Sequence, residues 1–257
     1  MSSYAFDNRW HKARQRLAFL EQCLDPGTCS RIRALGITNG WECLEVGAGG
    51  GSVAQWLCSQ VGAAGRVLAI DIDTNFLDSL DEANLEVRRH NLVSDTLPQN
   101  NFDLIHARMV LMHIPSREEI LPRLVSALKP GGWLLLEESD IYPVLATASG
   151  SYRQVWERFK QGMIEHAGVA PEWARKLPQL LAEQGLQEVG AEGDIPMFPG
   201  GSPMAQFWSL TWEQVRERIL AAGVDEKILD EVLGMLSDAT EWFTGPAIIA
   251  AWGRRPS

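Results

Sequence analysis

A run of glycines follows a short apolar stretch and could bind a ligand through its backbone. Gly47, Gly49 and Gly51 come directly after Cys43–Val46, and the residues from Ser52 onward have a helical pattern. Glycine adopts positive φ angles and lets a ligand approach where a Cβ would block it. The N-terminus of the next helix offers unpaired N–H groups. This strand–loop–helix pattern predicts a cofactor-binding loop.

The residues around the loop separate three kinds of cofactor. A P-loop requires a G-K-[ST] sequence, and this loop has no lysine. A dinucleotide loop is matched only in the frame Gly49, Gly51, Ala54, which makes that signal weak. Glu45, two residues before the first glycine, favours S-adenosylmethionine, because a strand-end carboxylate can accept hydrogen bonds from its ammonium group directly or through water.

A second acidic residue ends the next apolar stretch. Val67–Ile70 leads into Asp71, twenty residues after Gly51. A carboxylate here can accept hydrogen bonds from both ribose hydroxyls, and Ile72 beside it can pack on an adenine. NAD enzymes also place an acid here. Asp71 therefore indicates an adenosine ligand more than a methionine.

Four motifs occur in one order along residues 41–138, and together they are specific. They are Glu45–Gly51, Ala69–Asp73, Phe102–Ile105 and Leu128–Gly132. On these motifs the chain resembles the class I S-adenosylmethionine-dependent methyltransferases, and its two ends resemble, more loosely, the small-molecule branch found in bacterial secondary metabolism. The resemblance implies methyl transfer from S-adenosylmethionine. It also implies a Rossmann-like α/β fold, with a seven-stranded mostly parallel sheet of order 3-2-1-4-5-7-6, strand 7 antiparallel, and helices on both faces.

The resemblance also assigns cofactor contacts to individual residues. Where the family often has an acid for the adenine amino group, the aligned residue is Asn91; Asp95 is the alternative. The implied contacts are the loop residues Glu45, Gly47, Ala48, Gly49 and Gly51, then Asp71 at the ribose, Ile72, Asn91 and Leu92 at the adenine, and Ala107 and Arg108 on the methionine side.

Three residues are candidates for catalysis. Methyl transfer mainly requires that the acceptor be positioned and water excluded, and an oxygen or nitrogen acceptor can also need a general base. His113 follows the fourth expected strand, and either accepts a proton or shapes the site by binding loop backbone. Glu138 follows the fifth strand and could instead be a solvated carboxylate, while His166 could point into a chamber or face solvent. His106, inside the fourth strand, is expected only to pack.

The elements that position these residues follow from apolar runs and helical spacing. A helical lid segment is expected over residues 1–40, broken at Pro26-Gly27 and resuming at Thr28. The cofactor-binding α/β core is expected over 41–138, and a helical cap around the last strands over 139–257. The expected strands are 41–46, 67–70, 85–89, 102–107, 133–136, 186–191 and 247–252, and the expected helices are 52–60, 74–82, 116–128, 151–184, 203–222 and 225–240.

The net charge, the cysteine pattern and the lack of long apolar runs limit which ligands and partners are expected. The net charge of −10 disfavours a nucleic-acid partner, since it repels phosphates. The four cysteines form no C-x-x-C pair, and no histidine has zinc-finger spacing, so no metal site is expected. The chain has no apolar signal or membrane-spanning run, which predicts a cytoplasmic protein without a membrane partner.

The acceptor is therefore expected to be a small aromatic or apolar molecule, methylated on oxygen or nitrogen and bound between the sheet's carboxyl edge and a Trp-rich cap. Three alternatives stay open. They are an NAD(P)-linked oxidoreductase, a cofactor-binding relative with a non-methylating role such as assisting a cyclisation, and a non-catalytic binding module. A homodimer also stays open.

Overall fold

The computed structural model describes residues 6–257, apart from the side chains of residues 166 and 167. The chain forms two compact units, each built from segments that are distant in the sequence. We call them the helical unit and the sheet unit. The helical unit comprises Met1–Cys23, Ser139–Trp173 and Gly193–Ile248, and the sheet unit comprises Leu24–Glu138, Ala174–Glu192 and Ile249–Ser257.

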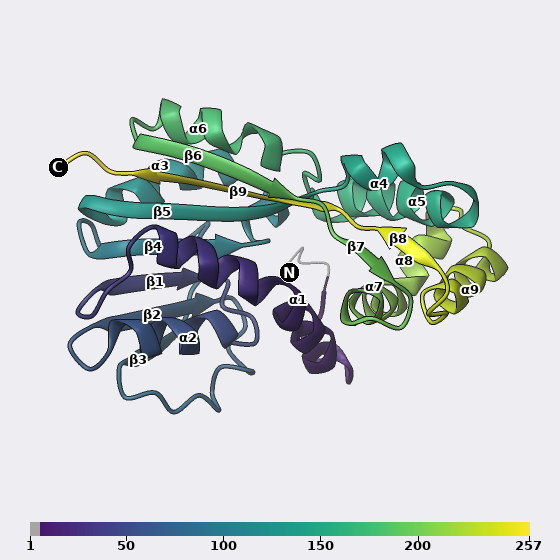
Figure 1. Cartoon of the computed structure of the whole chain (residues 1–257), viewed down its shortest axis with the longest axis horizontal. Coiled ribbons are helices and arrows are strands. Elements are labelled where there is room, and N and C mark those ends of the chain that lie inside the picture. The colour runs from purple at the N-terminus through teal and green to yellow at the C-terminus, as the bar shows by residue number, and fades with distance from the viewer. Residues whose placement is uncertain (1–5) are drawn as a thin grey trace. The chain divides into compact units, whose positions relative to one another are not determined.

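A seven-stranded sheet organises the sheet unit, with the order β3-β2-β1-β4-β5-β9-β6 (Figure 1). β1 pairs in parallel with β2 and β4, as do β2 with β3 and β4 with β5. β9 runs opposite to β5, and Arg255 exchanges backbone hydrogen bonds with Gly131 and Gly132 (Figure 1). The predicted strand order is confirmed, with β9 as the seventh strand. The strands are β1 Glu42–Val46, β2 Arg66–Asp71, β3 Leu85–Arg89, β4 Phe102–Arg108, β5 Leu128–Asp140, β6 Gln187–Asp194 and β9 Ala247–Arg254.

Helices connect these strands and cover the sheet. Helix α1 begins in the helical unit and ends in the sheet unit. Side chains alternate between the two faces along each strand, so Cys43 of β1, Leu104 of β4 and Leu135 of β5 share one face. That face packs against Ile32 of α1 and Leu57 of α2 in a fully buried core. The helices are α1 Ala13–Ala34, α2 Ser52–Val61, α3 Arg117–Ala127 and α6 Leu177–Glu183, with short 3-10 helices at Leu111–His113 and Ala174–Lys176.

The helical unit has an aromatic core. Trp156 and Trp212 are fully buried, and Trp156 meets Trp208 edge to face at 4.5 Å between ring centroids. Trp156, Trp208 and Trp212 thus pack on one another in this core. The unit contains α4 Tyr142–Thr147, α5 Gly150–Ala167, α7 Pro203–Gln214, α8 Arg216–Ala221 and α9 Glu226–Met235, with a two-stranded antiparallel sheet of β7 Met197–Pro199 and β8 Trp242–Thr244.

The N-terminal helix differs from its prediction. Pro26-Gly27 predicted a break, yet α1 continues through both residues. Proline removes one intrahelical hydrogen bond. Just beyond it, Thr28 and Arg31 bond to Glu137 of β5 at 2.5 and 2.8 Å. These tertiary contacts outweigh the local helix breaker.

Two other local predictions are also wrong. The helix expected over residues 74–82 is a series of turns, because Asp73 accepts a hydrogen bond from the Asn75 amide and short polar side chains compete with helix formation. The helix expected over 203–222 is interrupted at Val215, between α7 and α8.

Candidate functional site

The glycine loop joins β1 to α2 in a conformation that requires glycine. Gly47 and Gly49 have φ angles of 66° and 56°, in the left-handed region. A Cβ on Gly47 would lie 2.3 Å from Val110 Cγ2, in the segment after β4. The Gly47 amide donates to the Ile70 carbonyl of β2 at 2.7 Å. The loop is therefore held between the ends of the two neighbouring strands.

Asp71, at the end of β2, is tied to this loop. Its Oδ2 accepts from the Gly49 amide at 3.0 Å, and its Oδ1 accepts from the Asp73 amide at 3.0 Å. Burial raises the pKa of Asp71, although the backbone hydrogen bonds oppose that rise. Each carboxylate oxygen can accept more than one hydrogen bond, so both keep capacity for a ligand. Ile72 beside it is 39% exposed, unlike most large apolar residues of the sheet.

Both candidates for the adenine position lie in one turn after β3. The backbone amide of Asn91 donates to Asp95 Oδ2 at 2.9 Å, and the side-chain Oδ1 of Asn91 accepts from the backbone amide of Val93 at 3.0 Å. Both side chains are exposed, whereas Leu92 is buried. Asn91 and Asp95 therefore lie side by side, and both stay candidates for the residue that accepts the adenine amino group.

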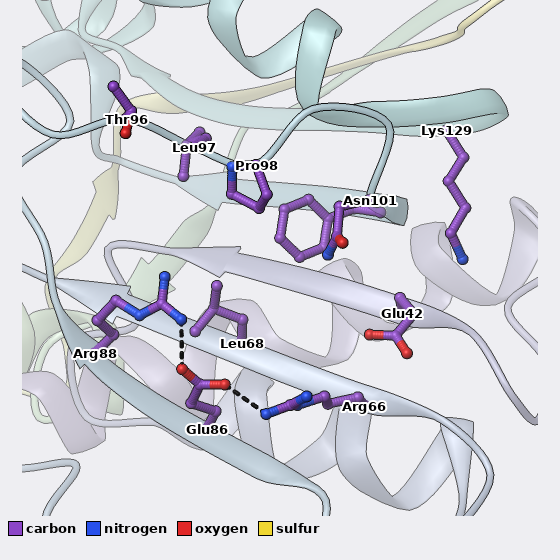
Figure 2. Close-up of a pocket in the computed structure, with 11 residues that line it drawn as sticks. Glu42, Arg66, Leu68, Glu86, Arg88, Thr96, Leu97, Pro98, Asn101 and Lys129 are labelled. Carbon is purple, nitrogen blue, oxygen red and sulfur yellow. Dashed lines mark hydrogen bonds and ion pairs between the residues drawn. The ribbon is translucent and has the colours of Figure 1, made fainter.

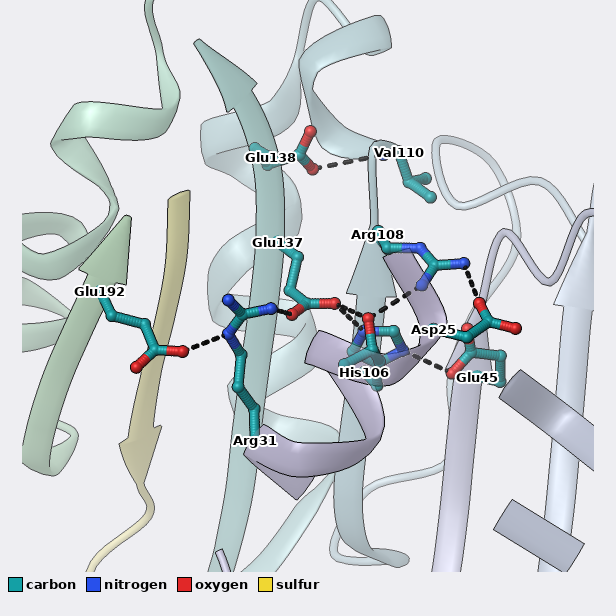
Figure 3. A network of polar contacts seen from close by, with 10 residues as sticks. Asp25, Arg31, Glu45, His106, Arg108, Val110, Glu137, Glu138 and Glu192 are labelled. Atoms are coloured by element: carbon teal, nitrogen blue, oxygen red, sulfur yellow. Dashed lines mark hydrogen bonds and ion pairs between the residues drawn. The ribbon is translucent and has the colours of Figure 1, made fainter. Parts of the chain in front are cut away.

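A buried polar cluster lies beside Glu45, on the sheet face that packs against α1 (Figure 3). His106 of β4 contacts Glu45 Oε2 through Nδ1 at 2.7 Å and Glu137 Oε2 through Nε2 at 3.1 Å. The three side chains share a face because each is an even number of residues from a core residue of its own strand. Arg31 reaches both Glu137 Oε1, at 2.8 Å, and Glu192 of β6, at 2.5 Å.

Opposite charges set the ionisation of this cluster. Burial alone would lower the pKa of His106, but Glu45 and Glu137 outweigh it and raise that pKa to about 9. Burial would raise the pKa of Glu137, but its hydrogen bond and charge interaction with His106 bring it down to about 2. The cluster therefore contains an imidazolium between two carboxylates at neutral pH.

Arg108, a predicted methionine-side residue, points toward α1 and extends the cluster. Its guanidinium donates to Thr28 Oγ1 at 2.8 Å and to Asp25 Oδ1 at 2.8 Å (Figure 3). Ala107, its predicted companion, is fully buried. The observed contacts of Arg108 hold α1 to the end of β4.

Glu138 organises the segment that follows β4. Its carboxylate accepts hydrogen bonds from the amides of Leu111 at 2.8 Å, Val110 at 3.3 Å and Met112 at 3.4 Å. The side chain is fully buried, so the alternative of a solvated carboxylate is wrong. Burial raises the pKa of Glu138 to about 8 against the opposing effect of these amides. The segment turns sharply at Met109, whose φ is 55°.

The positions of the other two catalytic candidates, His113 and His166, do not by themselves assign them a role. His113 ends the 3-10 helix just beyond this segment and is half-buried. His166 lies in α5, but its side chain is outside the described residues. The structure therefore brings Glu138 and the backbone leading to His113 together, and it does not test a contact by His166.

Sequence reasoning missed most of the polar cluster. His106 was expected only to pack, and this is corrected: it is fully buried and bonds two carboxylates. Glu137, Thr28 and Arg31 were not singled out. A usable signal existed, because two acids directly follow the apolar run of β5 and His106 occupies the carboxyl half of a buried strand.

A cavity of about 690 Å³ lies elsewhere on the sheet, near the amino ends of its strands (Figure 2). Arg66, Glu86 and Arg88 line it, and both arginines form ion pairs with Glu86. Neither Glu45 nor Asp71 borders it. Ligands of open α/β sheets bind at the carboxyl ends of the strands, so the glycine loop remains the candidate site.

Among the described residues, no group of three or more His, Cys, Asp or Glu side chains is arranged to hold a metal ion. Within the same part of the chain, no helix has the length and apolar character needed to cross a membrane. All four cysteines are free thiols.

Comparison with known proteins shows the family to which the chain belongs. A family model described as a methyltransferase domain matches residues 5–189, which is most of the chain. Methyltransferase str2 of Strobilurus tenacellus is 34% identical over 166 residues, or 62% of this chain and 58% of that protein. Methyltransferase str3 of the same organism is 33% identical over 100 residues, or 38% of this chain and 35% of that protein. The chain belongs to this methyltransferase family, as the motifs predicted, and the matches span 58% and 35% of these two relatives' length.

Solved structures support the fold. Phosphoethanolamine N-methyltransferase 2 of Haemonchus contortus, in complex with phosphomonomethylethanolamine and S-adenosylhomocysteine, has a TM-score of 0.57 at 18% sequence identity. The match covers 99% of this chain and 55% of that one. The predicted Rossmann-like fold is therefore confirmed. The family model and the two Strobilurus relatives are methyltransferases, so they give the NAD(P)-linked alternative no support.

Proposed function

We propose that this chain transfers the methyl group of S-adenosylmethionine to a small molecule. The observation that carries the proposal is a glycine loop flanked by two strand-end carboxylates, Glu45 of β1 and Asp71 of β2. An acid at the end of β1 suits a cationic ligand group, and an acid at the end of β2 suits a ribose. The family match of residues 5–189 supports the same activity.

The residues present suit the cofactor. Glu45 Oε2 is bonded to His106, which leaves its second oxygen to accept from an ammonium group. Asp71 is oriented by the Gly49 amide to accept from ribose hydroxyls, and exposed Ile72 offers an apolar surface to an adenine. When bound, S-adenosylmethionine supplies an electrophilic methyl group on its sulfonium. The chain's own residues then hold the cofactor, orient the acceptor and exclude water.

A small, uncharged, ring-containing acceptor methylated on oxygen or nitrogen is the second part of the proposal. The net charge of −10 disfavours polyanionic acceptors such as RNA. The helical unit is rich in aromatic side chains, and Trp156 and Trp208 belong to its core. A place in secondary metabolism, a cytoplasmic location and a homodimer stay predictions.

Proton acceptance from the acceptor is assigned in this proposal to His113. Glu138 positions the preceding segment, because its carboxylate binds three consecutive backbone amides there. His166 stays a further candidate. A His113→Ala variant should lose kcat more than cofactor affinity, and equal losses of both would remove this assignment.

Ligand binding tests the cofactor. Thermal shift and calorimetry with S-adenosylhomocysteine, S-adenosylmethionine and NAD should show stabilisation by the first two only. Asp71→Ala should reduce that stabilisation, whereas Asp78→Ala removes the same charge from an exposed turn and should retain it in full. Stabilisation by NAD alone would contradict the proposal.

Methyl transfer tests the acceptor. Purified protein is incubated with isotopically labelled S-adenosylmethionine and separate pools of phenols, aryl amines, total RNA and protein. Label should appear in a phenol or aryl amine by mass spectrometry. Label confined to RNA or protein would overturn the small-molecule part and leave the cofactor part standing.

A further inference from the structure

Both ring nitrogens of His106 are committed to carboxylates. Nδ1 lies 2.7 Å from Glu45 Oε2, and Nε2 lies 3.1 Å from Glu137 Oε2. A carboxylate only accepts, so each contact requires an N–H on the ring. A neutral imidazole has one N–H, and an imidazolium has two. The geometry therefore requires a cationic His106.

The two carboxylates are not equally satisfied. Glu137 also accepts from Thr28 Oγ1 and Arg31, so it keeps charge and hydrogen-bond partners beyond the histidine. Within the described part of the chain, Glu45 bonds only to His106, and only through Oε2. Its side chain is 5% exposed. A carboxylate so far removed from water is costly unless a second cation or donor completes its shell.

Glu45 lies where β1 leads into the glycine loop. Glu45 precedes Gly47 by two residues, at the carboxyl end of β1, and its neighbours along the sheet are Ala69 and His106. No side chain of the cluster other than His106 reaches it, because Arg31 and Arg108 are directed to Glu137, Glu192, Asp25 and Thr28. Glu45 therefore keeps one oxygen without a hydrogen-bond partner among the described residues, on the strand that leads directly into the glycine loop.

We propose that His106 is a positioning residue: held as an imidazolium by Glu137, it fixes the Glu45 carboxylate so that the free oxygen receives the ammonium group of the cofactor's methionine portion. This rests on the proposed function. The buried cluster of side chains from α1, β4 and β5 then keeps the Glu45 carboxylate in the orientation that the cofactor needs. Its specific consequence is that His106 acts on the amino-acid end of the ligand and leaves the adenosine end unaffected.

Two ligands separate these ends. S-adenosylhomocysteine carries the amino-acid portion, whereas 5′-methylthioadenosine has the adenosine and thioether without it. Calorimetry on wild type, H106L and H106N is expected to show S-adenosylhomocysteine binding weakened at least about tenfold in H106L. It should weaken less in H106N, whose amide keeps a donor toward Glu45. Affinity for 5′-methylthioadenosine should stay within about twofold in both. Equal losses for the two ligands, or no loss for either, would overturn the proposal.

A double-mutant cycle tests the path through Glu45. In an E45Q background, H106L should cause little further loss of S-adenosylhomocysteine affinity, because the carboxylate that it positions is gone. Additive losses would overturn the positioning role. Wild-type protein that binds neither ligand would overturn the proposed function itself, so the two failures are distinguishable.

Wild-type protein provides a measurement that does not depend on a variant folding. Imidazole ¹⁵N NMR of the ligand-free chain at pH 7 should show His106 as an imidazolium with two slowly exchanging N–H protons. The charged groups that contact His106 are Glu45 from β1 and Glu137 from β5. Glu137 in turn bonds to Arg31 and to the Thr28 hydroxyl of α1, and Arg108, next to His106 in β4, bonds to Thr28. A neutral ring with one bare nitrogen at pH 7 would overturn the proposal.

Discussion

The Asp71 carboxylate accepts the amide hydrogen of Gly49 at 3.0 Å, which links the end of β2 directly to the glycine loop after β1. The same carboxylate also accepts from the Asp73 amide. Two backbone amides thus fix its orientation before any ligand is present. Such preorganisation reduces the entropy that a ligand must lose when it binds.

Replacing Asp71 tests that arrangement. Hydrogen bonds to a charged group contribute about 1.5–3 kcal/mol each. We expect Asp71→Ala to weaken S-adenosylhomocysteine binding at least about tenfold while the circular dichroism spectrum is kept. Calorimetry is the measurement, and the exposed Asp78→Ala is the control. Unchanged affinity in folded Asp71→Ala would remove Asp71 from the site.

Substitutions at Gly49 and Gly36 form a matched pair that tests the loop. Its φ of 56° strains any β-branched residue by about 1–3 kcal/mol, and a side chain there would enter the space of a loop-bound ligand. Gly36 has a φ of +88° and open space around its Cβ position. We expect Gly49→Val and Gly36→Val to lose similar thermal stability, with ligand-induced stabilisation abolished only in Gly49→Val. Retained stabilisation in Gly49→Val would exclude the loop as the binding site.

Most of the sheet could be predicted from the sequence, because buried parallel strands are continuous apolar runs with turn residues between them. The Val67–Ile70 run became β2 and the Phe102–Ala107 run became β4 with small changes at their ends. Local rules failed where tertiary contacts dominate. Pro26 predicted a helix end, but the helix continues because Arg31 is held by Glu137 and Glu192.

The site was predictable in its backbone and less so in its side-chain network. The glycine spacing and the acids Glu45 and Asp71 are local patterns, and a single sequence shows them. The contact between His106 and Glu137 depends on the register of β4 against β5. Register follows from packing and not from either strand alone, so the sequence could place polar residues toward the carboxyl ends of both strands but could not show that they meet.

Glu138 should make stability fall as pH rises. Its folded-state pKa of about 8 lies above the ordinary value of 4.5, so between these values the folded state binds more protons than the unfolded state. The free energy of unfolding then decreases with pH over this window, by up to about 1.4 kcal/mol per pH unit. Below pH 4.5 both states are protonated and the effect is absent.

Glu138→Gln should remove this contribution, since the amide has no proton to lose. Urea unfolding of wild type and variant from pH 4.5 to 8 gives the difference curve, and subtracting the two cancels the contributions of other groups. Glu119→Gln, on an exposed position of α3, is the control. A flat difference curve would show that Glu138 titrates at an ordinary pKa.

Arg31 joins α1 to Glu137 of β5 and Glu192 of β6. The Arg31 side chain is 8% exposed, and the Glu137 side chain is fully buried. Removing one partner of a buried ion pair leaves the other charge uncompensated, at a cost of about 3–5 kcal/mol. We expect Arg31→Met to lower the free energy of unfolding toward that range, with His106 and Thr28 limiting the loss. Arg14→Met breaks an exposed pair with Glu21 on the same helix and should cost at most about 1 kcal/mol.

The pH dependence should change in the same variant. The pKa of Glu137 is lowered to about 2, so its contribution to stability is complete above pH 4.5 and is lost as pH falls toward 2. Without Arg31 that pKa should rise, and acid unfolding should begin at a higher pH. Urea midpoints and acid titrations followed by circular dichroism measure both effects. If Arg31→Met and Arg14→Met behave alike in both, the buried pair does not stabilise the attachment of α1 to the sheet.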